Sequence, residues 1–433
     1  MRKEKKGRGL VGGLLAIAAV LATAQVQAVP SFARQTGMPC TACHTVFPEL
    51  TSFGRSFKLN GYTMTGTAQV SQDADKAASG VSVDASPPLS AMLQVGITHL
   101  SKAEDSTQNN DVQFPQQFSL FYAGKISDHL GAFVQITYDQ AGGAVALDNT
   151  DVRYANSTTM AGKALTYGLT LNNNPTVQDL WHSSPAWGFP YLASGSAPTP
   201  TASPFMGGLG QDVTGLGAYG LWNEMIYAEL SLYRSSHQGQ AKPDAASSNT
   251  ITGSAPYWRL AWQHAAENGD YMMVGLNGMS MSLIPAGITP PADKYSDKVL
   301  DAQYEHHMND NMLVMHASVT SEKQTLDASM PGFSPTLRTV KLDGSYHCGS
   351  KATTTLGVWK TTGDEGDYSA TYGYANPVSK PDNSGWIGEV SYLPWQNTRL
   401  SLQYTAYRKF DNLPVGRSAS DNNTTFLQGW VVW

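Results

Sequence analysis

The chain has few charged residues and few cysteines for its length. Of its 433 residues, 14% are Asp, Glu, Lys or Arg, and three are cysteines. Charge this low is unusual for a soluble protein. The formal net charge of −6 gives no reason to expect nucleic acid as a partner. After the first 28 residues no apolar run is long enough for a transmembrane helix, while Tyr, Trp and Gly are plentiful. This composition excludes a helical membrane protein and favours a membrane β-barrel.

Catalytic signatures are also missing. The sequence contains no Gly-rich phosphate loop, no nucleophile elbow and no HExxH pair. Its histidines show no repeated metal-ligand spacing. The chain therefore offers no residues arranged for bond-making chemistry. Whether it is an enzyme stays open.

The first 28 residues have the organisation of an export signal. Basic residues precede an apolar stretch at 10–23, which is too short to span a bilayer comfortably. Val26-Gln27-Ala28 fits a small-residue cleavage site, so the mature chain is expected to start at Val29. An uncleaved membrane anchor is the alternative.

Cys40-Thr41-Ala42-Cys43-His44 is the most informative stretch. It has the C-x-x-C-H spacing of a c-type haem attachment site, in which both thiols form thioethers and the histidine ligates the iron. A redox disulfide between Cys40 and Cys43 is an alternative, which the adjacent histidine disfavours. A zinc site is weaker, because no second Cys/His pair lies at ligand spacing. We predict one covalently bound haem c, and the single occurrence of the motif excludes a multi-haem wire.

The sixth haem ligand is less certain from sequence. Met64 follows His44 by twenty residues, and a thioether opposite a histidine raises the reduction potential, which suits electrons from a weak reductant. Lumen-facing histidines such as His316 or His347 are alternatives. The basic residues available to pair with haem propionates are Arg34, Arg55 and Lys58.

Three parts follow the signal. A haem segment at 29–66 precedes a linker at 67–87, rich in Ala, Ser, Asp and Gly, and a porin-like barrel at 88–433. The haem segment is predicted to contain one short helix that begins at Pro48 and stops before Gly61. Its apolar face would carry Leu50, Phe53 and Phe57.

Strand-period alternation supports the barrel. In 89–98 every odd position is apolar, and segments such as 132–138 and 340–346 alternate in the same way. We count about sixteen such segments, an even number typical of porins. Phe426–Trp433 reads as the closing strand, with a terminal aromatic residue. The predicted fold is an all-β, antiparallel transmembrane barrel with a small helical haem segment, located in the outer membrane of a Gram-negative bacterium.

Two features of the barrel bear on its lumen. Residues 172–212 break the strand rhythm and contain several aromatic residues, which argue against disorder. This stretch is expected to fold into the lumen, to cap the outer face, or to be a plain extracellular loop. Asp297, Asp301 and Glu305 share one face of a candidate strand and are expected to line the lumen, either drawing cations inward or simply solvated.

The haem segment resembles a known family. The stretch 28–37, the haem motif and the stretch 48–63 are similar to the outer-membrane cytochrome–porin fusion of iron-oxidising bacteria. The resemblance is dense over this segment and only architectural over the barrel. Cys40, Cys43 and His44 match the family motif, whereas the resemblance does not place the sixth ligand.

The resemblance implies outer-membrane electron transfer. One haem in or at the barrel would take electrons from extracellular Fe(II) and pass them to a periplasmic cytochrome. Two other functions stay open: a haem-bearing conduit for a different donor or acceptor, and a diffusion porin.

Overall fold

The computed structural model describes residues 30–64, 87–104, 108–140, 143–236, 249–288, 290–375 and 379–433. The predicted export signal at 1–28 and nearly all of the predicted linker at 67–87 lie outside these residues.

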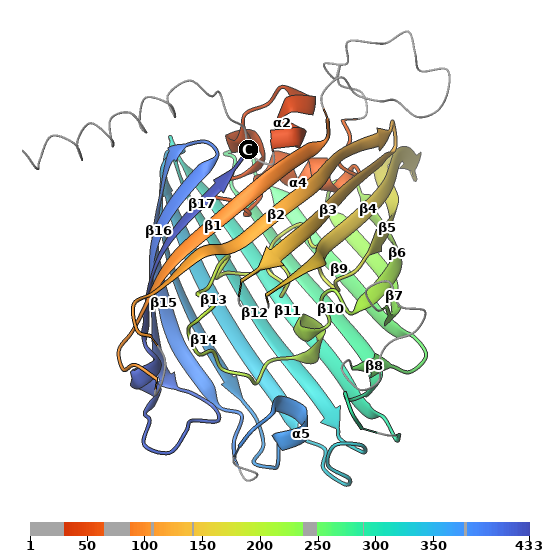
Figure 1. The fold of residues 1–433 in the computed structure, drawn as a ribbon. Helices are drawn as coiled ribbons and strands as arrows, with labels where there is room; N and C mark the ends of the chain where they lie inside the picture. Colours follow the sequence, from red (N-terminus) through yellow and green to blue (C-terminus); the bar gives the residue numbers. More distant parts are fainter. Residues whose placement is uncertain are drawn as a thin grey trace, which may run out of the picture.

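The described chain forms a closed antiparallel β-barrel, as predicted (Figure 1). Each wall strand pairs with its neighbours, and β1 closes the wall by pairing with both β2 and β17. Of the 17 strands in the sheet, 16 form the wall. The remaining strand, the two-residue β8 (Thr250–Ile251), pairs with the end of β10. The wall strands are β1 (Leu89–Leu100), β2 (Asp111–Ser127), β3 (Leu130–Asp139), β4 (Ala144–Met160), β5 (Lys163–Asn172), β6 (Val213–Trp222), β7 (Ile226–Ser235), β9 (Ala255–Ala265), β10 (Tyr271–Ile284), β11 (Asp293–Met308), β12 (Asn311–Thr325), β13 (Thr336–Cys348), β14 (Ala352–Thr362), β15 (Asn383–Trp395), β16 (Thr398–Lys409) and β17 (Thr424–Val432).

Alternation along each strand separates an apolar outer face from a polar inner face. On β7, Leu230 and Leu232 are 58% and 52% exposed, whereas Glu229 and Ser231, which alternate with them, are buried. An outward apolar band on a closed barrel is the surface that a bilayer covers. The chain is therefore an outer-membrane type of barrel, and the predicted location is confirmed. Within the described ranges, no helix has the length and apolar character to cross a membrane.

Three short helices lie at the end of the barrel where the C-terminus lies (Figure 1). They are α2 (Pro30–Thr36), α3 (Cys40–Cys43) and α4 (Ser52–Leu59). The prediction of one helix beginning at Pro48 is wrong. The helix begins after Thr51, because the Thr51 side chain accepts a hydrogen bond from the Gly54 backbone N–H and caps it. The predicted stop is correct, since Gly61 follows with a φ of +68°.

The two ends of the barrel differ in their connections. At the end that carries α2–α4, the turns are short, as at 128–129 and 309–310. At the opposite end, the connections are longer, as at 363–382, which includes α5 (Ser369–Tyr372), and at 410–423, which includes the short helix η3 (Ala419–Asn422). Barrels of this type have short periplasmic turns and long extracellular loops. The three helices therefore lie at the periplasmic end.

The segment between β5 and β6, residues 173–212, runs through the barrel interior and is called here the lumen segment. It includes the short helix η2 (Phe205–Gly208). Inward-facing side chains from distant strands bind its backbone: Gln116 Nε2 of β2 lies 2.9 Å from the Ala193 carbonyl, and Gln403 Nε2 of β16 lies 3.0 Å from the Leu192 carbonyl. Of the three placements considered from sequence, the lumen is the one observed.

Candidate haem site

The three helices, the lumen segment and inward-facing residues of β1–β4 and β17 line a cavity of about 380 Å³ at the periplasmic end of the barrel. Cys40, Cys43 and His44 all line it. This volume falls within the range of cofactor and small-molecule sites. Much of the wall is apolar or aromatic, with Phe32, Phe47, Phe57, Met92, Phe121, Phe133 and Val432. The predicted haem motif therefore opens onto a space with the character that a porphyrin requires.

The single turn of α3 brings the two cysteines to the same cavity. Burial and the neighbouring Cys40 raise the pKa of the Cys43 thiol to about 11, so this thiol stays protonated near neutral pH. The described residues contain no cluster of three or more His, Cys, Asp or Glu that could hold a metal ion.

His44 is held in the tautomer that an axial ligand needs. Its Nδ1 lies 3.1 Å from the Pro48 carbonyl oxygen and 3.2 Å from that of Glu49. Carbonyl oxygens only accept hydrogen bonds, so Nδ1 carries the proton and donates it. Nε2 then keeps its lone pair, as an iron ligand requires.

Helix α4 packs directly against the haem motif. The Thr51 hydroxyl donates to the Ala42 carbonyl at 2.6 Å, and the Thr51 backbone N–H donates to the Cys43 carbonyl at 3.0 Å. A Cβ on Gly54 would lie 2.3 Å from the Cys43 carbonyl oxygen. Only glycine allows this approach, so Gly54 sets the spacing between α3 and α4.

Gly54→Val is therefore expected to displace α3 from the cavity. Overpacking of this kind destabilises a fold by about 1–3 kcal/mol. A smaller fraction of the chains should therefore carry the predicted haem. Haem staining normalised to protein on a denaturing gel measures the ratio. Ser56→Ala, at an exposed position of the same helix, is the matched control and should stain like the unmodified chain. Equal staining of Gly54→Val and the control would contradict the packing argument.

The three predicted propionate partners are bound within the protein. Arg34 donates to the Leu89 carbonyl, and Arg55 forms a buried ion pair with Glu305. Lys58 Nζ donates to the carbonyls of Val177 and Asp179 at 2.6 and 2.7 Å. Burial, and then the charge of Arg153, lower the pKa of Lys58 to about 7.

Of these three basic residues, Lys58 lines the cavity and the two arginines do not. The propionate role predicted for Arg34 and Arg55 is therefore without support from their positions.

Several cavity-lining side chains have a buried polar atom with no hydrogen-bond partner among the described residues. Buried polar atoms are rarely left unpaired, so each one marks a group that expects a partner from outside the chain. Tyr191 O–H and Trp430 Nε1–H are donors, which suit carboxylate oxygens such as those of haem propionates. The four atoms are Gln94 Oε1, His182 Nδ1, Tyr191 Oη and Trp430 Nε1.

The sequence did not single out these residues as a site. For His182 and Tyr191, the only signal was the concentration of aromatic residues in the lumen segment.

The residues considered for the sixth ligand lie elsewhere. Met64 is partly buried and is not among the residues that line the cavity. His316 Nδ1 lies 2.9 Å from Asp343, and His347 Nε2 lies 3.3 Å from Glu49. Neither histidine lines this cavity. Ligation by Met64 stays a prediction.

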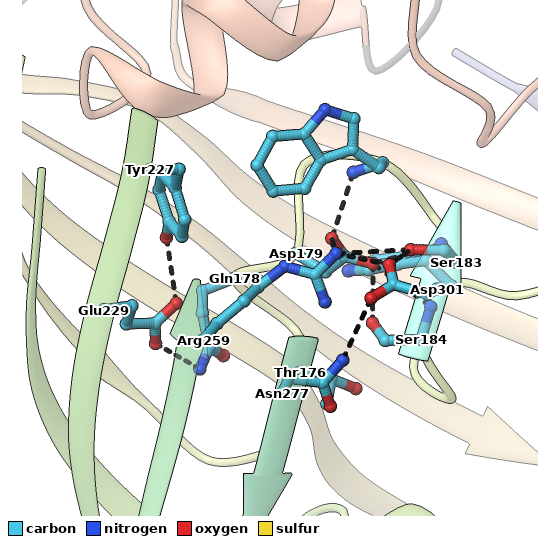
Figure 2. Close-up of polar contacts among 12 residues, drawn as sticks. Thr176, Gln178, Asp179, Ser183, Ser184, Tyr227, Glu229, Arg259, Asn277 and Asp301 are labelled. Atoms are coloured by element: carbon cyan, nitrogen blue, oxygen red, sulfur yellow. Dashed lines mark hydrogen bonds and ion pairs between the residues drawn. The ribbon is translucent and has the colours of Figure 1, made fainter. Parts of the chain in front are cut away.

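The acidic residues of β11 face the lumen, as expected, but they are buried and partnered. Asp301 lies 2.5 Å from Arg259. Figure 2 shows this contact. Glu305 pairs with Arg55. Asp297 accepts a hydrogen bond from the Met206 backbone at 3.3 Å. Each is at most 2% exposed. The expectation that they draw cations inward is therefore not supported.

Comparison with known proteins adds little beyond the architecture. No family model matches the chain, and no curated protein matches its sequence. Similar solved structures include a loop-deletion mutant of OmpT, an outer membrane protein of Vibrio cholerae (10% identity, covering 80% of this chain and 98% of that one, TM-score 0.45), and Salmonella typhi OmpF in complex with daunomycin (12%, 80% and 97%, 0.44). A mutant of the Rh. blastica porin gives 11% identity, 80% and 99% coverage, and a TM-score of 0.42.

The class of protein follows from the chain's own closed wall and apolar outer band. It is an outer-membrane β-barrel protein with a lumen segment and a helical N-terminal segment at one mouth.

Proposed function

We propose that this barrel is an outer-membrane electron-transfer protein that carries one c-type haem. Cys40 and Cys43 would hold the haem covalently, and His44 would be an axial ligand. The observation that carries the proposal is that all three residues line one cofactor-sized, largely apolar cavity, with the His44 tautomer set by two backbone carbonyls. A bound haem would supply a reversible one-electron couple there.

The direction of transfer in this proposal is from outside the cell to the periplasm. Fe(II) gives up one electron and becomes Fe(III), and a periplasmic cytochrome is reduced by that electron. Fe(II) would have to reach the haem from the extracellular mouth of the barrel, because the cavity lies at the periplasmic end, and the insoluble Fe(III) would then form in the barrel rather than in the periplasm. The position of the cavity at the periplasmic end supports delivery to a periplasmic carrier, because Cys43 is only partly buried at that mouth.

The test is a single-turnover experiment with purified, oxidised, haem-loaded protein. Mixing it with Fe(II) under anoxic conditions is expected to produce the spectrum of reduced c-type haem. Protein with both cysteines replaced is the control and should show no such change. If Fe(II) leaves the haem oxidised while another small reductant or a periplasmic cytochrome reduces it, the iron donor is wrong and a general haem conduit remains.

A diffusion porin is the second candidate function. A barrel of 16 strands favours it, because barrels of that size can enclose a water-filled channel. The lumen segment opposes it, since its backbone and side chains bind strands on several sides of the interior. Channel conductance separates the two functions and is taken up in the Discussion.

A further inference from the structure

A second histidine lines the haem cavity. Among its described lining residues, His44 and His182 are the two histidines, one from the haem segment and one from the lumen segment. His182 is 4% exposed, and its Nδ1 is buried without a hydrogen-bond partner in the described chain. A buried nitrogen without a hydrogen-bond partner is unfavourable, because it has lost its contact with water and gained nothing in exchange. Its persistence here points to a partner that the polypeptide does not supply.

The backbone around His182 is held in an uncommon conformation. His182 has a φ of +56°, a region that non-glycine residues seldom occupy. The Asp179 carboxylate accepts hydrogen bonds from the backbone N–H groups of Trp181, Ser183 and Ser184 at 3.0, 3.1 and 3.2 Å. This carboxylate therefore closes the turn in which His182 lies.

Contacts with the barrel wall hold this turn in place. Arg259 of β9 lies 3.6 Å from Asp179 and 2.5 Å from Asp301 of β11, and the Ser183 hydroxyl donates to Asp301 (Figure 2). All four side chains are buried or partly buried in the lumen. Backbone strain of this kind persists where the surroundings over-determine it, and it concentrates at functional sites.

The His182 side chain is also held in place. It stacks on Trp187, with ring centroids 5.7 Å apart and planes at 20°. Trp187 also lines the cavity, and its Nε1 donates to the Val177 carbonyl at 2.7 Å. His182 borders a second, smaller cavity of about 60 Å³ further along the lumen. The ring thus stands between the haem cavity and the interior of the barrel.

Other residues are less suited to a second axial position. Of the two methionines that line the cavity, Met92 already accepts a hydrogen bond at its sulfur from Gln94 Nε2 at 3.6 Å, and Met38 lies too close to the attachment site at Cys40 to reach the far face of a haem. Lys58 Nζ already donates to two carbonyls. Tyr191 Oη is unpaired, but a phenol is foremost a hydrogen-bond donor at neutral pH. Met64, His316 and His347 do not line the cavity.

We propose that His182 is the second axial ligand of the haem. This rests on the proposed haem attachment, and it assigns the iron to two imidazoles, His44 from the haem segment and His182 from the lumen segment. The lumen segment would then be fastened to the haem segment through the cofactor. Because a thioether ligand raises the potential relative to a second imidazole, the haem should have a lower reduction potential than ligation by Met64 would give.

The test compares His182→Ala with Met64→Ala by spectroscopy. His182→Ala should keep its covalent haem stain, change from a low-spin to a high-spin oxidised spectrum, and bind carbon monoxide when reduced. Added imidazole should restore the low-spin spectrum. Met64→Ala should leave the spectrum unchanged. A low-spin spectrum in His182→Ala, or its loss in Met64→Ala alone, would overturn the assignment.

Two further measurements test the assignment of His182 even if His182→Ala fails to fold. If His182→Ala does not fold, electron paramagnetic resonance of the unmodified protein decides between two imidazoles and an imidazole–thioether pair. His182→Met should introduce the sulfur-to-iron charge-transfer band and raise the reduction potential. An unmodified chain without any haem stain would instead contradict the proposed function.

Discussion

Replacing both Cys40 and Cys43 with alanine is expected to remove all covalent haem from the chain. A haem attached to a C-x-x-C-H motif stays with the denatured polypeptide through its two thioether bonds. In the described chain, the remaining cysteine, Cys348, lies exposed at the end of β13, away from the cavity. Haem staining of the denatured protein should fall from one haem per chain to none.

Cys348→Ala is the matched control for this prediction, because it removes a thiol without touching the haem segment. It should keep full staining. The doubly substituted chain should still assemble as a barrel, since the wall closes through β1, β2 and β17 without the helices. Persistent stain in the double variant would rule out the attachment site.

Arg259→Met is expected to loosen the lumen segment and to open the barrel to ions. Arg259 is about 1% exposed and binds Asp301 at 2.5 Å and Asp179 at 3.6 Å. Removing one partner of a buried ion pair costs roughly 3–5 kcal/mol, because the remaining charge is left unpaired. Here two buried carboxylates lose the same cation. Unfolding in denaturant should show the loss, and single-channel conductance in planar bilayers should rise above that of the unmodified protein.

Two variants make this prediction specific. Arg234→Met removes an arginine from the exposed face of β7. Its effects on the stability and on the conductance should both be much smaller than those of Arg259→Met. Adding Asp301→Asn to Arg259→Met should recover part of the lost stability, since one unpaired charge is removed. A large, steady conductance in the unmodified protein, unchanged by Arg259→Met, would favour the diffusion porin instead.

The barrel could be predicted from sequence because its signal is local. Apolar and polar residues alternate within each strand, and the predicted closing strand at Phe426–Trp433 corresponds to β17, which ends at Val432. The start of α4 could not be placed as well. Proline is a common first helical residue, so Pro48 predicts an early start, whereas the Thr51 side chain caps the helix three residues later.

Of the residues that line the cavity, only those of the N-terminal segment could be predicted from sequence as a site. Cys40, Cys43 and His44 are neighbours in sequence, so their spacing predicts a haem attachment site. His182, the second axial ligand in our proposal, is distant from them in sequence and has no characteristic spacing to them. Its position depends on contacts between residues far apart in the chain, such as Ser183 with Asp301, which only the folded barrel brings together. The acidic residues of β11 illustrate the same limit, since their pairing with Arg55 and Arg259 is not visible in sequence.

Electron transfer across a membrane is the most direct test of the account. Vesicles that contain oxidised cytochrome c and carry the haem-loaded barrel in their membrane should reduce the enclosed cytochrome when Fe(II) is added outside. Vesicles with the Cys40→Ala, Cys43→Ala barrel should not, which controls for leakage of iron. We expect reduction only with the haem-loaded protein. An enclosed cytochrome that stays oxidised, although the barrel is inserted and carries its haem, would contradict the central claim.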